Sequence, residues 1–323
     1  MPANYQKRRF QDICILCGFL LCGGGLLFYS KVVSAAMTQA LNLCIQVLLP
    51  SLFPFFVLSS MLISTGVVQR LSPLWEKPFR RLFGLPGIFG ASLLLGAAGG
   101  YPVGAKSIAM LYQQGFCSKD SAEKALCFCN NAGPAFLISA VGAGLLNNRA
   151  IGLRLYGIHV LSALILGIIA DRNTGVVKCN SITSFSASKS KGISLFLHSV
   201  TDASASFMNV SAFVLIFAVI SAILQQLPLL DALRLLPGGG VLWYGILSGT
   251  LELTSGVSFL SQGNLPAEIL WPALSFLCGW GGCSVQLQTI SFLREAGLSC
   301  RKYLKCKLLQ GILAALLTGM ICF

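Results

Sequence analysis

The chain has 323 residues, of which 55% are hydrophobic and only 10% are charged, and its mean hydropathy is +0.78. Soluble domains contain about 25% charged residues, so this composition excludes a soluble globular protein and indicates an integral membrane protein. The net charge of +13 is concentrated in short segments between apolar runs, which the positive-inside rule explains better than nucleic-acid binding does.

Several apolar runs are close to the ~20 residues needed to cross the hydrocarbon core of a bilayer. They are residues 13–29, 43–65, 151–170, 210–227, 241–260 and 308–323. The sequence therefore predicts an all-α, polytopic membrane protein of about 8–10 helices. The basic segments, which we expect to lie in the cytoplasm, are residues 7–9, 70–81, 172–191 and 294–307.

The chain begins with a basic segment and an apolar run, which is typical of either a secretory signal peptide or an uncleaved first span. No small-residue cleavage site follows the run, because Tyr29, Ser30 and Lys31 come next. We therefore expect residues 1–31 to form an N-terminal transmembrane helix. Residues 70–81 alternate basic and apolar side chains, which predicts an amphipathic helix in the membrane interface.

Two glycines interrupt the apolar run that begins at residue 88. The residues before Gly99 and Gly100 form about 16 Å of helix, which reaches about the middle of the bilayer. Pro102 disfavours helical geometry at the residue before it and suits the first position of a new helix. The pattern predicts a re-entrant hairpin or a broken helix, which is tolerated at membrane depth only inside protein or beside a watery cavity.

A second interruption lies within the apolar stretch of residues 125–146. It consists of Asn130, Asn131, Gly133 and Pro134, residue types that end one helix and start another. A turn outside the membrane has a similar composition. Because the whole stretch has spanning length, we expect a break inside the bilayer.

The serine-rich residues 171–191 are expected to form a cytoplasmic linker between two repeats, residues 40–170 and 192–323. Residues 99–115 align without a gap onto residues 281–297, which places Gly99 and Gly100 on Gly281 and Gly282. A second similarity pairs residues 56–64 with residues 213–221. The two alignments have different offsets, and they leave open whether the repeats are parallel or inverted.

Three polar side chains in apolar surroundings are candidate binding residues. A lysine inside a membrane segment, such as Lys106, costs about 2.5–3.5 kcal/mol and usually faces a cavity and a partner. In the gapless alignment Lys106 corresponds to Gln288, which lies on a polar helix face. Glu252 is a carboxylate among apolar residues that needs a cation or a cluster of donors, and Lys106 is one possible partner.

Each of these residues also has a structural explanation. Lys106 can reach the interface by snorkelling, Gln288 can hydrogen-bond between helices, and Glu252 can fix helix register. If half-helices begin at Pro102 and Pro134 near the midplane, their positive ends favour an anionic or hydroxyl-rich solute.

Sequence signatures of enzymes are absent, since the chain has no Walker loop, nucleophile elbow or cluster of metal ligands. We expect neither an enzyme nor a bound metal or cofactor. His198 and Asp202 are expected on an amphipathic surface helix. The 13 cysteines lie mostly in apolar runs, where a free cysteine behaves as a small hydrophobic residue.

The chain resembles the sporulation integral membrane protein YlbJ family, whose members contain the nucleoside-recognition Gate domain. The motifs that carry this resemblance, in order over roughly residues 40–320, are Leu49-Pro50-Ser51-Leu52-Phe53-Pro54-Phe55-Phe56, Gly99-Gly100-Tyr101-Pro102-Val103-Gly104-Ala105-Lys106, Asn130-Asn131-Ala132-Gly133-Pro134 and Leu247-Ser248-Gly249-Thr250-Leu251-Glu252-Leu253-Thr254-Ser255-Gly256.

This resemblance implies a multispanning protein of spore-forming Firmicutes that is needed for a proper spore envelope. It also implies two Gate-like repeats, similar to parts of concentrative nucleoside transporters and of the ferrous iron transporter FeoB. The segment Trp280-Gly281-Gly282-Cys283-Ser284 departs from the pattern because it lacks the proline of the first motif.

We therefore expect a multi-pass protein of the cell membrane, in a spore former the mother-cell or forespore membrane, that recognises or translocates a small polar solute. The residues expected to line its cavity are Lys106, Asn130, Asn131, Glu252 and Gln288. The alternative is a non-transporting scaffold or assembly factor of the developing spore, in which these residues only hold helices together. The expected partners are the lipid bilayer and a small polar or anionic solute, and the oligomeric state is left open.

Overall fold

The computed structural model of the protein describes residues 13, 16, 23–171, 192–226, 233 and 239–323. Most of the predicted N-terminal helix and nearly all of the predicted linker lie outside these residues. The described residues form helices and no strands, which confirms the all-α prediction. The helices are more numerous than expected because breaks divide several apolar segments into half-helices.

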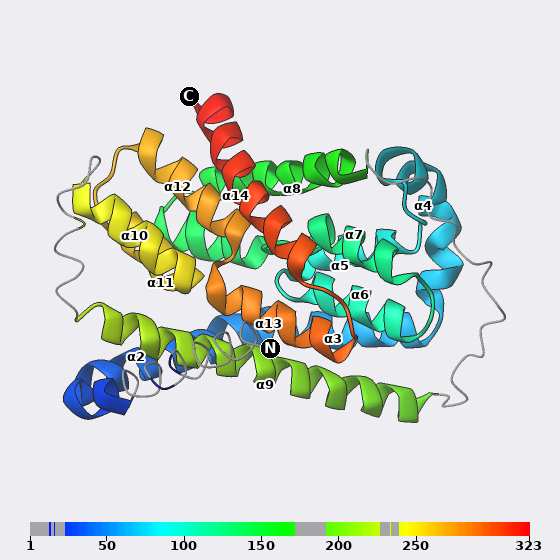
Figure 1. Ribbon diagram of the computed structural model, residues 1–323, viewed down its shortest axis with the longest axis horizontal. Coiled ribbons are helices and arrows are strands. Elements are labelled where there is room, and N and C mark those ends of the chain that lie inside the picture. Colours follow the sequence, from blue (N-terminus) through cyan, green and yellow to red (C-terminus); the bar gives the residue numbers. More distant parts are fainter. Residues whose placement is uncertain (1–12, 14–15, 17–22, 172–191, 227–232, 234–238) are drawn as a thin grey trace, which may run out of the picture.

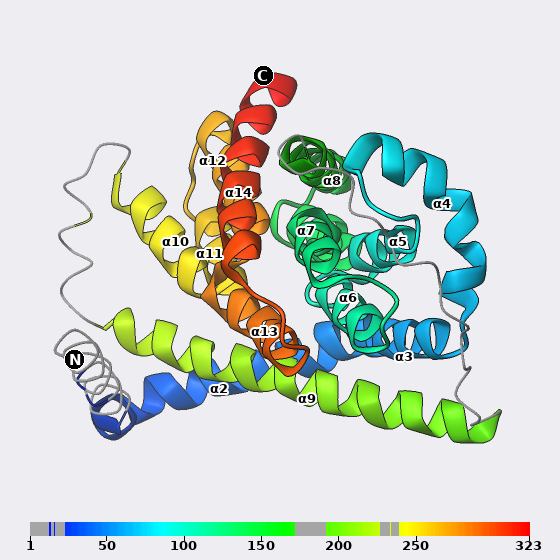
Figure 2. The ribbon, with the colours of Figure 1, turned by 45° about the vertical axis from the view of Figure 1, so that its right-hand side comes forward.

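Four apolar segments are long enough to cross a membrane. The first combines α2 (Ser30–Leu43), the π-helix η1 (Cys44–Leu48) and α3 (Leu49–Ser64). The other three are α8 (Arg149–Asp171), α9 (Ile193–Leu224) and α14 (Arg301–Cys322). Helix α9 runs the length of the molecule beside α2 and α3 (Figures 1 and 2). The described chain is thus a polytopic α-helical membrane protein.

The amphipathic helix predicted around residues 70–81 is α4 (Val67–Phe83), which lies crosswise at one end of the molecule (Figure 1). It begins and ends next to glycines in the left-handed conformation, Gly66 and Gly84. Arg70, Arg80 and Arg81 are exposed along it. We call this the basic end of the molecule and the opposite end the far end. The positive-inside rule predicts that the basic end lies in the cytoplasm.

Two helical hairpins enter the molecule from opposite ends. Helices α5 (Phe89–Gly99) and α6 (Val103–Gln113) pack against each other as a hairpin from the basic end. Helices α10 (Gly239–Leu251) and α11 (Leu253–Gln262) form a second hairpin from the far end. The tips of both hairpins lie in the interior of the protein, as a re-entrant segment requires.

Two further segments are interrupted but continue across the protein. The first consists of α7 (Lys119–Cys129) and the π-helix η2 (Ala135–Leu145). The second consists of α12 (Ala267–Trp280) and α13 (Gly282–Glu295). The break between α12 and α13 is at Gly281, which has a φ of 88°. Both are broken spans, so the sequence correctly predicted the interruptions at Asn130–Pro134 and at Gly281–Gly282.

The two halves have the same order of elements but opposite orientations. Each half consists of a span, a hairpin, a broken span and a final span. Helices α3 and α9, the first spans, are antiparallel: Val33 of the first segment packs near Val219, whereas Phe56 lies in the same core cluster as Ala203. The halves are therefore inverted relative to each other, which answers the question that the sequence left open.

The gapless alignment of Gly99–Gly100 with Gly281–Gly282 is wrong as a topological equivalence. Gly99 and Gly100 are at the tip of a hairpin, whereas Gly281 lies within a broken span. By element order the counterpart of the first hairpin tip is Glu252, and the counterpart of Gly281 is the break at Asn130–Gly133.

The alignment failed because it matched two helices of the same local shape. Helices α6 and α13 both start in the interior and end at the basic end in the same cap. Phe116 donates its N–H to Leu111 O and Leu298 donates to Leu293 O, with glycines of φ 77° and 71° just before each donor. This is the Schellman motif, which is common to many helices and carries no information about topology.

Two glycines, one closely packed and one in open space, allow a matched pair of substitutions whose effects on stability should differ. A Cβ atom at Gly96 would lie 1.8 Å from the carbonyl oxygen of Cys129, whereas nothing lies within 4 Å of a Cβ at Gly157. We expect Gly96→Ala to lower the free energy of unfolding by about 3 kcal/mol or more, because backbone must move. We expect Gly157→Ala to be neutral or slightly stabilising. Unfolding in mixed micelles checks both, and equal effects would contradict the close α5–α7 contact.

Candidate functional site

A central cavity of about 80 Å³ lies where the hairpins meet the broken spans. Its walls come from both halves of the chain and include the starts of α6, η2, α11 and α13. Residues at these starts are Gly100, Tyr101, Gly133, Ala135, Glu252, Leu253, Thr254, Ser284 and Val285. Three of the predicted break residues, Gly99, Gly100 and Gly133, therefore line this one space.

Each hairpin tip touches a broken span through glycine. A Cβ atom at Gly133 would lie 3.0 Å from the Cα of Gly100, at the tip of the first hairpin. A Cβ atom at Gly282 would lie 3.0 Å from the N of Leu253, at the tip of the second. Gly100 and Gly282 also have positive φ angles of 88° and 75°, which glycine adopts without steric cost. These glycines let two non-helical segments approach closely beside the cavity.

The cavity receives the amino-terminal ends of four half-helices. A helix N-terminus carries a partial positive charge and N–H groups that lack intrahelical acceptors. These ends favour oxygen-bearing groups such as hydroxyls. Backbone N–H groups would thus act on a bound solute together with the one charged side chain in the wall, Glu252.

The side chain of Glu252 accepts hydrogen bonds from the N–H groups at one of these ends, the start of α11. Its carboxylate accepts hydrogen bonds from Thr254 N at 3.0 Å, from Ser255 N at 2.6 Å and from Ser255 Oγ at 2.7 Å. The residue is 5% exposed and lines the cavity. The carboxylate is therefore the N-cap of α11, which explains how it is stabilised without a side-chain cation.

A wider groove of about 430 Å³ continues from the cavity toward the far end. Phe136, Val214, Glu252 and Thr254 line both spaces. The groove extends to residues near the far ends of α9 and η2, such as Gln225. Glu252 thus stands at the junction between the inner cavity and its approach.

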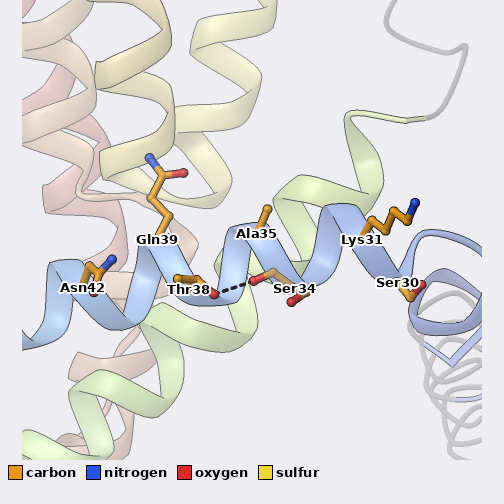
Figure 3. Close-up of a pocket in the computed structure, with 7 residues that line it drawn as sticks. All are labelled: Ser30, Lys31, Ser34, Ala35, Thr38, Gln39 and Asn42. Atoms are coloured by element: carbon orange, nitrogen blue, oxygen red, sulfur yellow. Dashed lines mark hydrogen bonds between the residues drawn. The ribbon is translucent and has the colours of Figure 1, made fainter.

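Gln39 of α2 also lines this groove. On the same helix Ser34, Thr38 and Asn42 follow one another at four-residue spacing, and Thr38 Oγ1 donates to Ser34 O (Figure 3). All residues that line the hollow in Figure 3 belong to this one helix. Side chains of one helix give that hollow a single wall, so the central cavity, which has walls from several elements, is the better candidate for a binding site.

The second predicted residue in the cavity wall is Gln288. Its Nε2 donates to Ser284 Oγ at 3.2 Å, and both residues line the cavity. Asn209 of α9 donates to Ser291 Oγ at 2.6 Å, one turn further along α13. The polar face predicted on this helix therefore turns toward the cavity and α9.

The backbone C=O groups at the carboxyl-terminal ends of half-helices accept hydrogen bonds from side chains. Tyr101 Oη donates to Cys278 O at 3.2 Å, and Trp280 Nε1 donates to Thr250 O at 3.3 Å. Tyr156 Oη donates to Ala97 O at 3.0 Å. Since lipid offers no donors, such bonds are needed wherever a helix ends inside the membrane.

Asn130 and Asn131 lie in this supporting layer and do not line the cavity. Asn130 accepts from Ala105 N and donates to Thr289 Oγ1 and Tyr303 Oη. Asn131 donates to Phe128 O at 2.7 Å. Both asparagines are fully buried, and they join the first broken span to the first hairpin and to the second half of the chain.

Lys106 also lies outside the cavity wall, and its partner is not Glu252. Its Nζ is 2.6 Å from Asp202 Oδ2 and 2.6 Å from Ser206 Oγ, both on α9, and 5.1 Å from the ring centre of Phe56. Lys106 is 4% exposed, so snorkelling to the interface does not describe it. Asp202, which the sequence placed on a surface helix, is the counter-charge that holds α9 against α6.

Lys307 is the most deeply buried lysine of the described residues, and sequence reasoning missed it. Lys307 was assigned with residues 294–307 to the cytoplasm, but it lies two turns into α14 and is 0% exposed. One signal was available, since Tyr303, Lys307, Gln310, Ala314 and Thr318 are spaced as one face of a helix and are all buried. The basic residues around Lys307 hid this pattern.

The fold and site define a polytopic α-helical membrane protein whose inverted halves meet at a central cavity, which is mostly apolar and has a few polar side chains in its wall. Among the described residues no three histidine, cysteine or acidic side chains are grouped as metal ligands. A family model described as Gate, nucleoside recognition, matches residues 45–149. The match contains the first hairpin and the first broken span.

The chain is also similar to the sporulation integral membrane protein YlbJ of Bacillus subtilis (strain 168). The two sequences are 27% identical over 97% of this chain and 83% of that protein. The resemblance carried by the sequence motifs is confirmed by these two findings. No solved structure matches the chain.

The Lys106–Asp202 pair predicts strong coupling between α6 and α9. We expect Lys106→Met and Asp202→Asn each to lower the free energy of unfolding, because each leaves a buried or half-buried group without its partner. The double variant should lose less than the sum of the single losses, by about 1 kcal/mol or more. Unfolding in mixed micelles measures this cycle. Additive effects would show that the pair does not stabilise the contact.

Proposed function

We propose that this protein binds and passes a small polar solute through the central cavity, as part of forming the spore envelope in a spore-forming bacterium. The observation that carries the proposal is the convergence of four half-helix N-termini on one central space that both halves of the chain build. This arrangement is typical of transporters with inverted repeats, in which the substrate lies at the interface of the repeats.

The dimensions limit how a solute is held. Small-molecule pockets generally measure about 300–1,000 Å³, whereas the inner cavity measures about 80 Å³ and the adjoining groove about 430 Å³. A neutral group such as a hydroxyl fits the inner cavity beside the Glu252 carboxylate, while the body of the solute fits the groove. A larger solute needs the hairpin tips to separate.

The route to the cavity is asymmetric. The groove reaches the far end of the molecule, whereas Lys106, Asp202 and a large buried core lie between the cavity and the basic end. With the basic end in the cytoplasm, as its charge predicts, the conformation described here is open toward the outer side of the membrane. Passage requires a second conformation in which α9 separates from α6.

The role in sporulation is supported by the name of the Bacillus subtilis relative. Nucleoside recognition is the description of the matching family, and a nucleoside belongs to the hydroxyl-rich solutes that the cavity favours. We place the protein in the mother-cell or forespore membrane, and we assign it no enzymatic reaction, metal or cofactor.

Glu252→Gln is the variant that tests this proposal. It keeps the shape of the side chain but removes the charge at the junction of cavity and groove. We expect saturable uptake of a nucleoside or sugar into proteoliposomes by the unmodified protein, and at least a tenfold loss of uptake in the variant. Ligands are found first by thermal-shift screening, since a ligand bound to the native state raises the unfolding temperature.

The matched control is Glu268→Gln, which removes an exposed carboxylate at the start of α12 and should leave uptake unchanged. The same variants are then introduced into a spore former. If folded Glu252→Gln protein retains full uptake and supports normal spores, the cavity is not the solute site. If the unmodified protein shows no saturable flux but spores fail without it, the scaffold alternative is supported instead.

A further inference from the structure

Lys307 is a fully buried ammonium at the centre of the layer that supports the cavity. Its Nζ donates to Asn130 O, to Gln310 Oε1 and, at 3.5 Å, to Tyr101 Oη. The same atom lies 5.1 Å from the ring centre of Tyr101 and 6.0 Å from that of Tyr303. The ammonium therefore contacts oxygens and aromatic faces from three parts of the chain: the first hairpin tip, the break after α7, and α14 itself.

No carboxylate within 4 Å balances this charge among the residues that the structure describes, in contrast to Lys106. A buried charge without a partner is costly, so the surrounding oxygens must stabilise it. One of them, Asn130 O, follows the last residue of α7, where the helix dipole places partial negative charge. Amide and phenol oxygens supply the remaining interactions.

The orientation of the Gln310 amide is fixed by its own partners. Its Nε2 donates to Asn131 Oδ1 at 3.0 Å and to His159 O at 3.2 Å. Both are acceptors, so the amide nitrogen must face them and the amide oxygen must face Lys307. The chain thus arranges an oxygen toward the ammonium by a second layer of hydrogen bonds.

Carbonyl, amide and hydroxyl oxygens directed at one point, together with aromatic faces, make a cation-binding site of low formal charge. We propose that this point is a site for a small monovalent cation, in particular a primary ammonium, and that the chain fills it with its own Lys307 side chain. The cation holds three parts of the cavity's support together: the first hairpin tip through Tyr101, the first break through Asn130, and α14.

This site is separate from the solute cavity, because neither Lys307 nor Gln310 lines that space. The inference therefore does not depend on transport. Its consequence is that the ammonium positions Tyr101, whose ring lines the cavity on one side and contacts Lys307 on the other.

Lys307→Ala tests the site by chemical rescue. The substitution removes three carbons and the nitrogen, which are the atoms of n-propylammonium. We expect the purified, full-length variant to unfold at a temperature lower by about 5 °C or more. Propylammonium chloride should restore most of that loss in a saturable manner. 1-Propanol, which has the same shape without the charge, and choline chloride at equal ionic strength should not.

Lys305→Ala is the matched control, because Lys305 is exposed on the same helix, and it should neither unfold earlier nor respond to propylammonium. Rescue of Lys307→Ala by 1-propanol as well would show that only volume matters. A complete absence of rescue by propylammonium would show that no cation site is present. Either result overturns the proposal.

Lys307→Met provides a second test that does not depend on diffusion into the site. Methionine fills the space of the lysine stem but carries no charge. We expect it to unfold as early as Lys307→Ala and to be insensitive to propylammonium. If Lys307→Met is as stable as the unmodified protein, the residue acts through packing and the proposed cation site is wrong.

Discussion

The structure depends on satisfying backbone hydrogen-bonding groups at helix ends that lie inside the membrane. Each end of a half-helix leaves up to four N–H or C=O groups unbonded, and lipid offers no partners for them. The protein separates the two kinds of end. Amino-terminal ends surround the cavity, whereas carbonyl ends receive donors from side chains such as Tyr101, Trp280, Tyr156 and Lys307. The cavity wall therefore combines the starts of half-helices with one carboxylate, Glu252, which caps α11.

The charged side chains inside the membrane follow the same constraint in three ways. Lys106 is paired with a carboxylate, Asp202. Glu252 is compensated by the N–H groups of the helix that it caps, and Lys307 by oxygens. Only Glu252 faces the cavity. The other two charges are fixed in contacts between elements, so the sequence could identify them as unusual but could not assign their roles.

The fold class, the amphipathic helix and the positions of the breaks could be predicted because they depend on local sequence. Gly100 with Pro102, and Asn130 with Pro134, stop a helix wherever they occur in an apolar run. Element partners could not be predicted in the same way. The alignment of Gly99–Gly100 with Gly281–Gly282 matched local helix shape, whereas the inverted relation of the halves emerges only from which helices pack together.

For the candidate site, the sequence likewise identified unusual residues but not their positions in the folded protein. Glu252 and Gln288 line the cavity, whereas Lys106, Asn130 and Asn131 lie behind it. All five are buried polar residues in apolar segments, so composition alone cannot distinguish a wall residue from a supporting one. Lys307 was overlooked because it lies in a basic segment. Its neighbours Arg301, Lys302 and Lys305 are exposed, and the charge of the segment as a whole does not reveal that one lysine faces the interior of the protein.

The inverted arrangement also constrains how the cavity can open. Both hairpin tips contact broken spans through glycine backbones, Gly100 with Gly133 and Gly282 with Leu253. The glycine contacts themselves contain no interlocking side chains, so the hydrogen bonds of Tyr101 to Cys278 O and of Trp280 to Thr250 O are what must break when a tip moves away. The Lys106–Asp202 pair, by contrast, is short and directional and lies on the side nearer the basic end. Because the groove already reaches the far end, movement of α9 at this pair is the step that would expose the cavity to the other side of the membrane.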